Sequence, residues 1–339
     1  MVHKVFKNPY VRFIIFGALF CTVPFLADWG IIRFATITTL SQVIYFGIAA
    51  LGLNILLGYS GSISLGTAGF MGLGAYAAVY VVNDWGSNFL IGILLAIAIP
   101  TALGLLVGLV SLKISGLYLA IATLCVSEIL LESFRQATDI TGGMSGRRTT
   151  WPEISIFGFE YTFDRSSMFI FLVIILVLIM ILTHNLVSGH LGRAFNAMRG
   201  SEAAAQAMGV NMLKYRLIAF AVATAYAGIA GSLIAYFIRA VSPGQWTLNF
   251  SLLVLAAVVI GGFRSIFGTI LGAFVVWVVP DLYLKNLPII GDNPALPFIF
   301  NGVLIILVIM FYPHGLIHIH HDITKVWHKL KPKGGGKRV

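Results

Sequence analysis

Long apolar runs, separated by short polar segments, fill most of the 339-residue chain. A helix that spans a bilayer needs roughly 20 mostly apolar residues. Seven segments meet this criterion clearly, and three others are shorter or richer in small residues. The clear segments are residues 10–27, 36–57, 89–112, 117–134, 167–184, 217–238 and 297–312, and the others are residues 62–82, 249–263 and 265–284. This pattern predicts an all-α, polytopic integral membrane protein with about ten transmembrane helices.

Two of the weaker segments leave the number of spans open. Residues 62–82 are rich in glycine and other small residues, and residues 249–263 are short for a full span. Either segment could be a broken or re-entrant helix, which is tolerated at membrane depth where protein or a water-filled cavity surrounds the backbone. About eight spans with two re-entrant segments therefore fit the sequence about as well as ten spans.

The composition excludes several other classes of protein. Hydrophobic residues make up 59% of the chain and charged residues only 10%, against about 25% charged residues in soluble domains. So few charges exclude a soluble enzyme and a disordered chain. The two cysteines, Cys21 and Cys125, lie in apolar runs, which argues against a disulfide scaffold. The first apolar run has no clear small-residue cleavage site, so we expect it to be a retained helix.

The distribution of charge predicts the orientation. Ten crossings that start in the cytoplasm place 15 basic and 2 acidic residues inside, and 7 basic and 10 acidic residues outside. The sides then carry +13 and −3, as the positive-inside rule requires. Both termini are therefore predicted in the cytoplasm, with a transmembrane domain at 1–316, an outer loop at 135–166 and an inner loop at 185–216. Residues 317–339 form a basic tail that we expect to contact anionic lipid headgroups.

The inner loop has the pattern of two short helices. Ser201 is a good N-cap, residues 202–208 are strongly helix-forming, and Gly209 is a natural helix stop. Residues 191–199 can form another helix, joined to the first at Gly200. Short alanine-rich helices suit a groove on a partner, because they approach closely and lose little side-chain entropy. We interpret the loop as a docking surface, with a plain connecting loop as the alternative.

Small and hydroxyl residues crowd into residues 58–74. In lipid, small residues let helices pack closely, and hydroxyls can bond freed backbone groups, so close packing is one interpretation. The other is a translocation path, because uncharged polar groups at membrane depth would suit a weak, transient site. The candidate path residues are Asn54, Ser62, Ser64, Gly66 and Thr67.

Ionisable side chains inside the predicted spans are few. Glu128 and Glu132 lie one turn apart, with Arg135 on roughly the same helix face near the outer end. They form a structural ion-pair cluster or, alternatively, an outer gate or a contact between subunits. The histidines of residues 314–321 follow the last run and suit interfacial anchoring, so no metal site is predicted.

The outer loop holds a second candidate surface. A loop that faces outwards beside the path could receive a docked protein, and its arginines could pair with acidic groups on that protein. A surface loop without a partner is the alternative. The candidate residues are Thr141, Gly142, Gly143, Arg147 and Arg148.

Several segments carry a family resemblance. Residues 192–220 begin with the sequence G-R-A-F-N-A-M-R-G-S-E-A-A-A-Q-A-M-G, and residues 51–76 contain G-Y-S-G-S-I-S-L-G-T-A-G-F. Residues 258–273 read V-V-I-G-G-F-R-S-I-F-G-T-I-L-G-A, and residues 312–316 read Y-P-H-G-L. Together they resemble the branched-chain amino acid ABC transporter permeases of the LivM type over most of residues 40–316.

The resemblance implies one subunit of an importer in a bacterial inner membrane that moves branched-chain or other hydrophobic amino acids. It implies a LivH-like second permease, two ATPase subunits and a periplasmic binding protein as partners. The chain has no Walker motif, so we expect no enzymatic activity and no cofactor, with ATP hydrolysed by a separate subunit. Nucleic-acid binding has no supporting pattern. The implied coupling residues are Arg193, Arg199, Glu202, Ala203, Ala204 and Gly209.

One departure and three alternatives accompany this resemblance. Other importer permeases place three residues between E-A-A and G, whereas four residues separate Ala204 from Gly209 here, so the partner's groove should differ in detail. A urea or short-amide permease of the same family is the nearest alternative. A stand-alone carrier or channel would normally carry charged coupling residues in mid-membrane. A membrane-embedded transferase would need a carboxylate or histidine cluster, for which Glu128 and Glu132 are the only candidates.

Overall fold

The computed structural model describes residues 8–30, 34–86, 88–112, 114, 116–156, 159–281 and 296–311. Within these ranges, six helical stretches are long and apolar enough to cross a membrane. They lie in α2 (Pro9–Asp28), α3 (Phe34–Leu53) with its continuation η1 (Asn54–Tyr59), α5 (Phe89–Val110), α6 (Leu117–Gln136), α8 (Arg165–Ser188) and α11 (Met212–Ile238). The described chain is therefore mostly helical, which agrees with the predicted all-α membrane protein.

The less regular apolar segments are helical as well. They correspond to α4 (Thr67–Asp84), α12 (Leu248–Gly261) and α13 (Ile266–Val279), and the last apolar segment holds α14 (Leu296–Phe311). α12 and α13 have 14 residues each, or about 21 Å at 1.5 Å per residue, which is shorter than the hydrocarbon core. Length alone therefore does not make each of them a full span.

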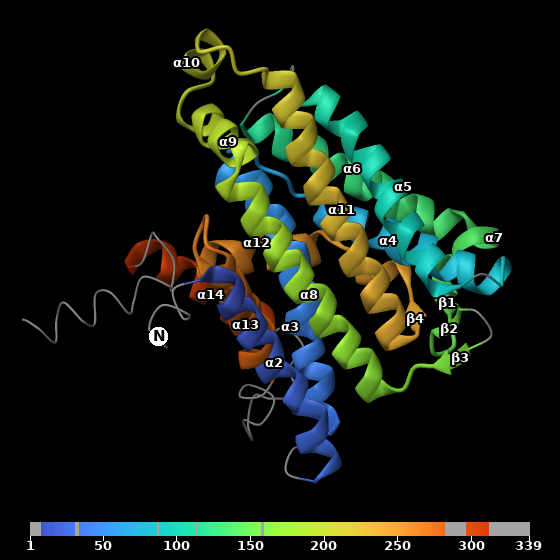
Figure 1. Cartoon of the computed structure of the whole chain (residues 1–339). Coiled ribbons are helices and arrows are strands. Elements are labelled where there is room, and N and C mark those ends of the chain that lie inside the picture. Colours follow the sequence, from blue (N-terminus) through green and yellow to red (C-terminus); the bar gives the residue numbers. More distant parts are fainter. Residues whose placement is uncertain are drawn as a thin grey trace, which may run out of the picture.

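Two helices extend beyond their predicted limits and shorten the inner loop. α8 continues to Ser188, and α11 already begins at Met212 because Asn211 caps it by accepting a hydrogen bond from the Lys214 amide at 3.0 Å. Between them lie α9 (His190–Gly200) and α10 (Glu202–Ala207), the two short helices that the sequence predicts. Figure 1 shows α9 and α10 at one end of the bundle, away from the short strands.

The helical structure is interrupted between α3 and α4, which agrees with the broken helix that the small-residue segment made possible. α3 widens into the π-helical η1, Gly61 adopts a φ of 75°, and α4 starts only at Thr67. Hydroxyls of neighbouring helices bind the amides freed by this break. Thr123 accepts from Leu65 at 2.9 Å, Ser251 from Ala68 at 2.9 Å and Ser127 from Gly69 at 3.1 Å. We call these three side chains the hydroxyl caps of α4.

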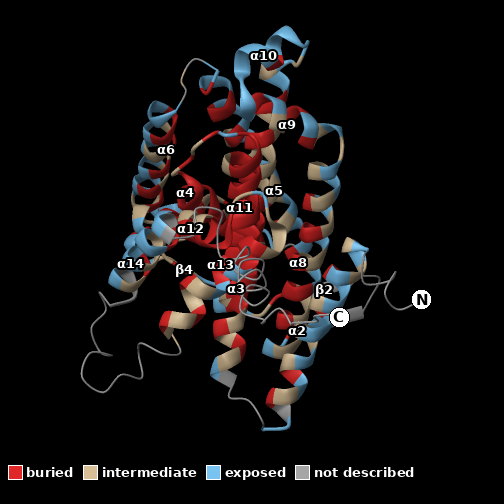
Figure 2. Cartoon of the chain, turned by 90° about the vertical axis from the view of Figure 1, so that its left-hand side faces the viewer, coloured by how far each residue is buried: buried red, intermediate tan, exposed pale blue. Residues whose placement is uncertain are grey.

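Small residues let α11 lie at the centre of the bundle, against α3, α4 and α5. A Cβ atom at Gly228 would collide with the Ala96 carbonyl of α5, and one at Gly231 with the Met71 carbonyl of α4. Glycine at these positions therefore allows helix backbones to touch. Figure 2 shows α11 as the largely buried helix in the middle of the molecule.

The outward faces of several helices are apolar instead of polar. Leu19 of α2 is 65% exposed, Leu94 of α5 64% and Leu178 of α8 55%. Large exposed aliphatic side chains on neighbouring helices are unfavourable in water and suit lipid. These faces therefore agree with a membrane around the bundle.

The segment predicted as the outer loop contains short elements that the sequence analysis did not predict. It contains α7 (Thr138–Thr141), a 3₁₀ turn η2 (Gly143–Ser145) and three strands, β1 (Arg147–Arg148), β2 (Glu153–Ile156) and β3 (Phe159–Thr162). β2 and β3 form an antiparallel hairpin, and β1 pairs with β4 (Ala240–Val241), which follows α11 and precedes the 3₁₀ turn η3 (Pro243–Gln245). Four short strands are thus added to the helical fold in the described residues.

Candidate functional site

α10 is a capped helix that projects from the bundle. Ser201 has extended backbone angles and its hydroxyl accepts a hydrogen bond from the Ala204 amide at 3.3 Å. Gly209 ends the segment with a φ of 82°, a value that favours glycine. Ala203 and Ala204 are exposed, Ala205 is the one buried residue of the helix, and Met208 just after it is 85% exposed. The helix presents a small, mildly apolar surface without acidic or basic groups beyond Glu202.

Unlike α10, α9 packs closely against the bundle. Gly192, Ala194, Phe195 and Met198 form its buried face, while Arg193 points away and is exposed. The buried face packs on the ends of α8, α11 and η1. Movement of α9 must therefore move the helix ends beneath it, since packed interiors resist deformation.

Arg199 connects α9 to the break between α3 and α4. Its guanidinium donates to the Gly58 carbonyl of η1 and lies over the Phe263 ring, 5.9 Å from the centroid. Gly58 lies in the last turn of η1, where main-chain carbonyls lack an intrahelical donor, and a charged donor satisfies one of them well. The predicted coupling loop and the predicted path segment are thus in direct contact through one side chain.

Arg264 makes a second connection, in the turn between α12 and α13. Its φ is 64°, which is unusual for a residue with a Cβ atom. Its amide donates to Asn54 Oδ1 at 3.0 Å, and its carbonyl accepts from the Tyr59 hydroxyl at 2.6 Å. Its guanidinium donates to Asn196 Oδ1 of α9 at 2.6 Å. The strained turn is therefore held by η1 on one side and by α9 on the other.

Asn54 is the polar centre of this arrangement. Besides accepting from Arg264, its amide nitrogen donates to Thr269 Oγ1 at 2.7 Å and to the Ser265 carbonyl at 3.3 Å. The residue is 2% exposed. Asn54 therefore bridges η1 to the α12–α13 turn. We call Asn54, Gly58, Asn196, Arg199 and Arg264 the α9 junction.

Glu202 ties the other short helix to α11. Its carboxylate pairs with Arg216, whose guanidinium also donates to the Ser111 carbonyl at 2.7 Å, at the end of α5. Arg216 is only 6% exposed, whereas the Glu202 side chain is 57% exposed. Sequence reasoning assigned Glu202 to a partner surface and missed Arg216, because their contact needs the fold of the loop.

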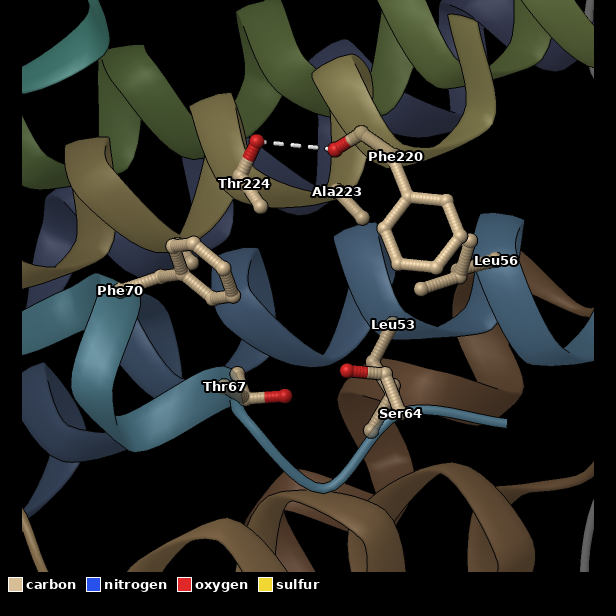
Figure 3. Close-up of a pocket in the computed structure, with 9 residues that line it drawn as sticks. Leu53, Leu56, Ser64, Thr67, Phe70, Phe220, Ala223 and Thr224 are labelled. Atoms are coloured by element: carbon tan, nitrogen blue, oxygen red, sulfur yellow. Dashed lines mark hydrogen bonds between the residues drawn. The ribbon is translucent and has the colours of Figure 1, made fainter. Parts of the chain in front are cut away.

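Two of the remaining predicted path residues border a small, partly open cavity. Ser64 and Thr67 line it together with Thr224 of α11, and the remaining walls are apolar. Figure 3 shows the hydroxyls of Ser64 and Thr67 pointing towards each other, below Phe70 and Phe220. The cavity measures about 10 Å³, close to the smallest space that holds a water molecule. A solute larger than a water molecule could pass here only if the helices moved apart.

Ser62 and Gly66 lie in the break between η1 and α4. Ser62 is buried and accepts from the Ser60 hydroxyl at 3.3 Å, while Gly66 precedes α4 and lies against α6. A Cβ atom at Gly66 would lie 2.7 Å from the Thr123 carbonyl oxygen. Both residues thus shape the irregular backbone beside the cavity. The hydroxyl caps of α4 were not among the predicted residues, since serine and threonine inside apolar helices give no specific signal.

The outer-loop residues mostly bond within the chain. Thr141 is buried and donates to the Phe134 carbonyl at 2.6 Å, and Gly142 and Gly143 have φ values of 75° and 58°. Arg147 forms an ion pair with Asp84 and lies over Tyr80, 5.3 Å from the ring centroid. Arg148 is exposed, with its backbone paired to β4. Of the two arginines, Arg148 has the more accessible side chain.

The predicted acidic cluster is an exposed surface feature. Arg135 and Glu132 pair at 3.4 Å, Gln136 donates to Glu132 at 2.8 Å, and Glu128 is exposed one turn earlier. In the described part of the chain, no group of three potential ligands is placed to bind a metal. The histidines at 314–321 and the basic tail at 317–339 lie outside the described residues.

Comparison with known proteins identifies the family. Residues 35–309 match the family model described as a branched-chain amino acid transport system permease component. The LivM permease proteins of Salmonella typhimurium and of Escherichia coli K12 are each 33% identical over 330 residues, which cover 91% of this chain and 74% of theirs. A probable LivH permease of Methanocaldococcus jannaschii is 27% identical over 63% of this chain and 66% of its own. No solved structure matches significantly.

The family model covers most of the chain, including α9, α10, the break before α4 and the α12–α13 turn. The relatives are permease proteins of high-affinity branched-chain amino acid transport systems. Their similarity extends over the same apolar helices that suit a membrane. The chain is therefore a multi-pass membrane permease that belongs to the branched-chain amino acid transport permease family.

Proposed function

We propose that this permease moves branched-chain or other hydrophobic amino acids into a bacterial cell as one subunit of an ABC importer. The observation that carries the proposal is the arrangement of α9 and α10. An exposed helix stands at one end of the bundle, and the helix beside it is bonded to the break next to the small cavity. This arrangement suits a transporter in which a partner that docks outside the membrane opens and closes a path within it.

The proposed orientation puts α9 and α10 in the cytoplasm, together with both termini. The excess of basic residues at this end of the predicted topology supports it. We propose that about ten helices cross or enter the membrane, with α4 entering after the break and α12 and α13 forming a short hairpin. Residues 135–164 would then face the periplasm.

The proposed partners are two ATPase subunits, a LivH-like permease and a periplasmic binding protein. Met208 and the alanines of α10 offer the small apolar surface that a groove on an ATPase subunit could accept. The similarity to a LivH permease supports pairing with a related subunit. The outer segment around Arg148 is the proposed contact for the binding protein, since its arginine side chain is exposed.

Force applied to α10 would reach the path through the α9 junction. A shift of α9 would pull the Gly58 carbonyl through Arg199 and the α12–α13 turn through Arg264. Both points adjoin η1, and Leu53 and Leu56 of that region line the small cavity. Apolar walls with a few hydroxyls would hold an aliphatic side chain weakly, which suits passage more than storage.

Transport by a reconstituted complex tests this function. Proteoliposomes with the permease, its second permease and ATPase subunits, and the binding protein should take up leucine only with ATP inside. Urea is the comparison substrate, because the sequence left it open. Urea uptake without leucine uptake would replace the proposed substrate class. Leucine uptake by this chain alone would reject the importer mechanism.

A pair of variants tests the coupling surface. Met208→Arg introduces a charge into the exposed apolar surface of α10 and should lower ATP-driven uptake at least tenfold, while the complex still inserts into membranes. Lys214→Gln removes an exposed charge at the start of α11 and serves as the matched control. Equal uptake by Met208→Arg and wild type would show that α10 does not meet the ATPase.

A further inference from the structure

An open groove lies beside the α9 junction, on the side of α2. It is bordered by the start of α2, the end of α8 and the α12–α13 turn, and its volume is about 610 Å³. Its lining includes Arg12, Tyr59, His184, Ser188, Arg264 and Phe267. We call it the Arg12–Arg264 groove. None of these residues belongs to the cavity at Ser64 and Thr67, so the groove is a separate feature.

The charged part of the groove favours an anion. Two arginines from distant segments line it, and no carboxylate occurs among the described residues of its lining. Arg264 is held in place by its bonds to Asn54, Tyr59 and Asn196. Ser265 caps α13 beside it, and Ile266 and Phe267 of the first turn also line the groove. The positive end of this helix dipole adds to the attraction for negative charge.

The rest of the groove is apolar and aromatic. Phe13 and Phe267 pack with ring centroids 5.2 Å apart, and Phe13 also meets His184 at 5.9 Å. Val187, Phe263 and Ile266 complete the apolar lining. A small soluble anion would gain nothing from these walls. A molecule with a charged head and a hydrocarbon chain would use both parts of the groove.

The position of the groove identifies the source of such a molecule. It lies at the end of α8 that leads into α9, which the charge distribution puts at the cytoplasmic interface. Neighbouring faces of α2 and α8 expose aliphatic side chains that suit lipid tails, such as Leu19 and Leu182. Basic pockets between transmembrane helices on this side of a membrane suit anionic headgroups.

We propose that the Arg12–Arg264 groove binds an anionic phospholipid of the inner leaflet. The phosphate group lies between the Arg12 and Arg264 guanidiniums, and an acyl chain lies along Ile266 and Phe267, which keep part of their surface exposed. The bound lipid links α2 and α8 to the α12–α13 turn, and so to the α9 junction. The site does not depend on which amino acid the permease moves.

Lipid binding to the intact complex tests the site. The probe is phosphatidylglycerol, added to the detergent-purified complex and counted by native mass spectrometry against phosphatidylcholine. The wild type should retain phosphatidylglycerol preferentially. Each lost arginine should weaken its binding about fivefold, since one basic residue near a phosphate contributes roughly that factor. Arg264→Asn suits the test because asparagine tolerates a positive φ.

The controls separate a site from general charge attraction. Lys214→Gln, which removes an exposed cation outside the groove, should leave binding unchanged, and Arg12→Lys should restore most of what Arg12→Gln loses. An equal loss with Lys214→Gln, or equal retention of both lipids by the wild type, would overturn the proposal. Displacement of the lipid by millimolar inorganic phosphate would assign the groove to a soluble anion instead. If Arg264→Asn does not fold, the Arg12→Gln and Arg12→Lys pair decides alone.

Discussion

α9 and α10 are neighbours in one loop but differ in almost every contact. α9 buries four residues and is bonded through Asn196 and Arg199 to two distant segments. α10 buries only Ala205 and is held at its start by Ser201 and Glu202. The comparison shows that α9 is the part of the loop packed against the bundle, and α10 is the part exposed at its end. Under the proposed function, a signal received by α10 would pass into α9.

The side chains explain the difference. Phe195 and Met198 give α9 a large apolar face to bury. Its Arg199 donates to the Gly58 carbonyl, and its Asn196 accepts from the Arg264 guanidinium. α10 is built from alanine, which stabilises a helix without offering much apolar area to the bundle. The exposed surface of α10 is thus a consequence of its composition and does not arise from poor packing.

Truncation of the buried aromatic residue of α9 should have the largest effect on stability. Phe195 is 1% exposed, and Phe195→Ala should destabilise the folded permease by about 3–5 kcal/mol. Thermal unfolding of the purified protein in detergent measures the loss. Met208→Ala, at the exposed end of α10, is the matched control and should shift the midpoint very little. Similar shifts for both variants would mean that α9 is no better anchored than α10.

Removal of the buried arginine beneath α10 should have an intermediate effect. Arg216→Met leaves the Ser111 carbonyl without its donor, and an unsatisfied buried acceptor costs about 1–3 kcal/mol. Glu202→Gln should cost less, because its side chain is 57% exposed and solvent weakens its ion pair. The two variants are compared in the same unfolding assay. A larger loss of stability for Glu202→Gln would show that the ion pair, and not the bond to the Ser111 carbonyl, holds α10.

Loss of the cap between the two helices should have the smallest effect. Ser201→Ala removes the hydroxyl that accepts from the Ala204 amide and should cost about 1 kcal/mol. Ser201→Asp keeps an acceptor and should behave like the wild type. Hydrogen exchange of the α10 amides reports the difference locally. Unchanged exchange in Ser201→Ala would show that contacts other than the cap hold α10.

Much of the fold follows from the sequence, because apolar runs of helical length have few alternatives in a membrane. Ser201 and Gly209 likewise marked the limits of α10 correctly from local chemistry. The short strands of the outer segment escaped prediction, since a two-residue strand such as β1 has no readable periodicity. Local sequence patterns therefore predicted the helices, but not which segments pack against one another.

The α9 junction could be predicted only in part. Asn54 and Arg199 were candidates, but for separate sites. They belong to one junction because Arg199 donates to Gly58, a residue more than 140 positions earlier in the chain. The positive φ of Arg264 has no sequence signal either, since glycine is the residue expected there. Contacts of this kind become visible only when the helices are placed.

The hydroxyl caps of α4 have a consequence for the resting permease. Thr123 accepts from Leu65 while it donates to the Ala120 carbonyl of its own helix at 2.9 Å. If the start of α4 moves away, this hydroxyl keeps one partner, so α6 loses little by the separation. Three bonds from side-chain hydroxyls fasten the start of α4 to α6 and α12. We expect their number to set how often an idle transporter leaks solute in the absence of ATP.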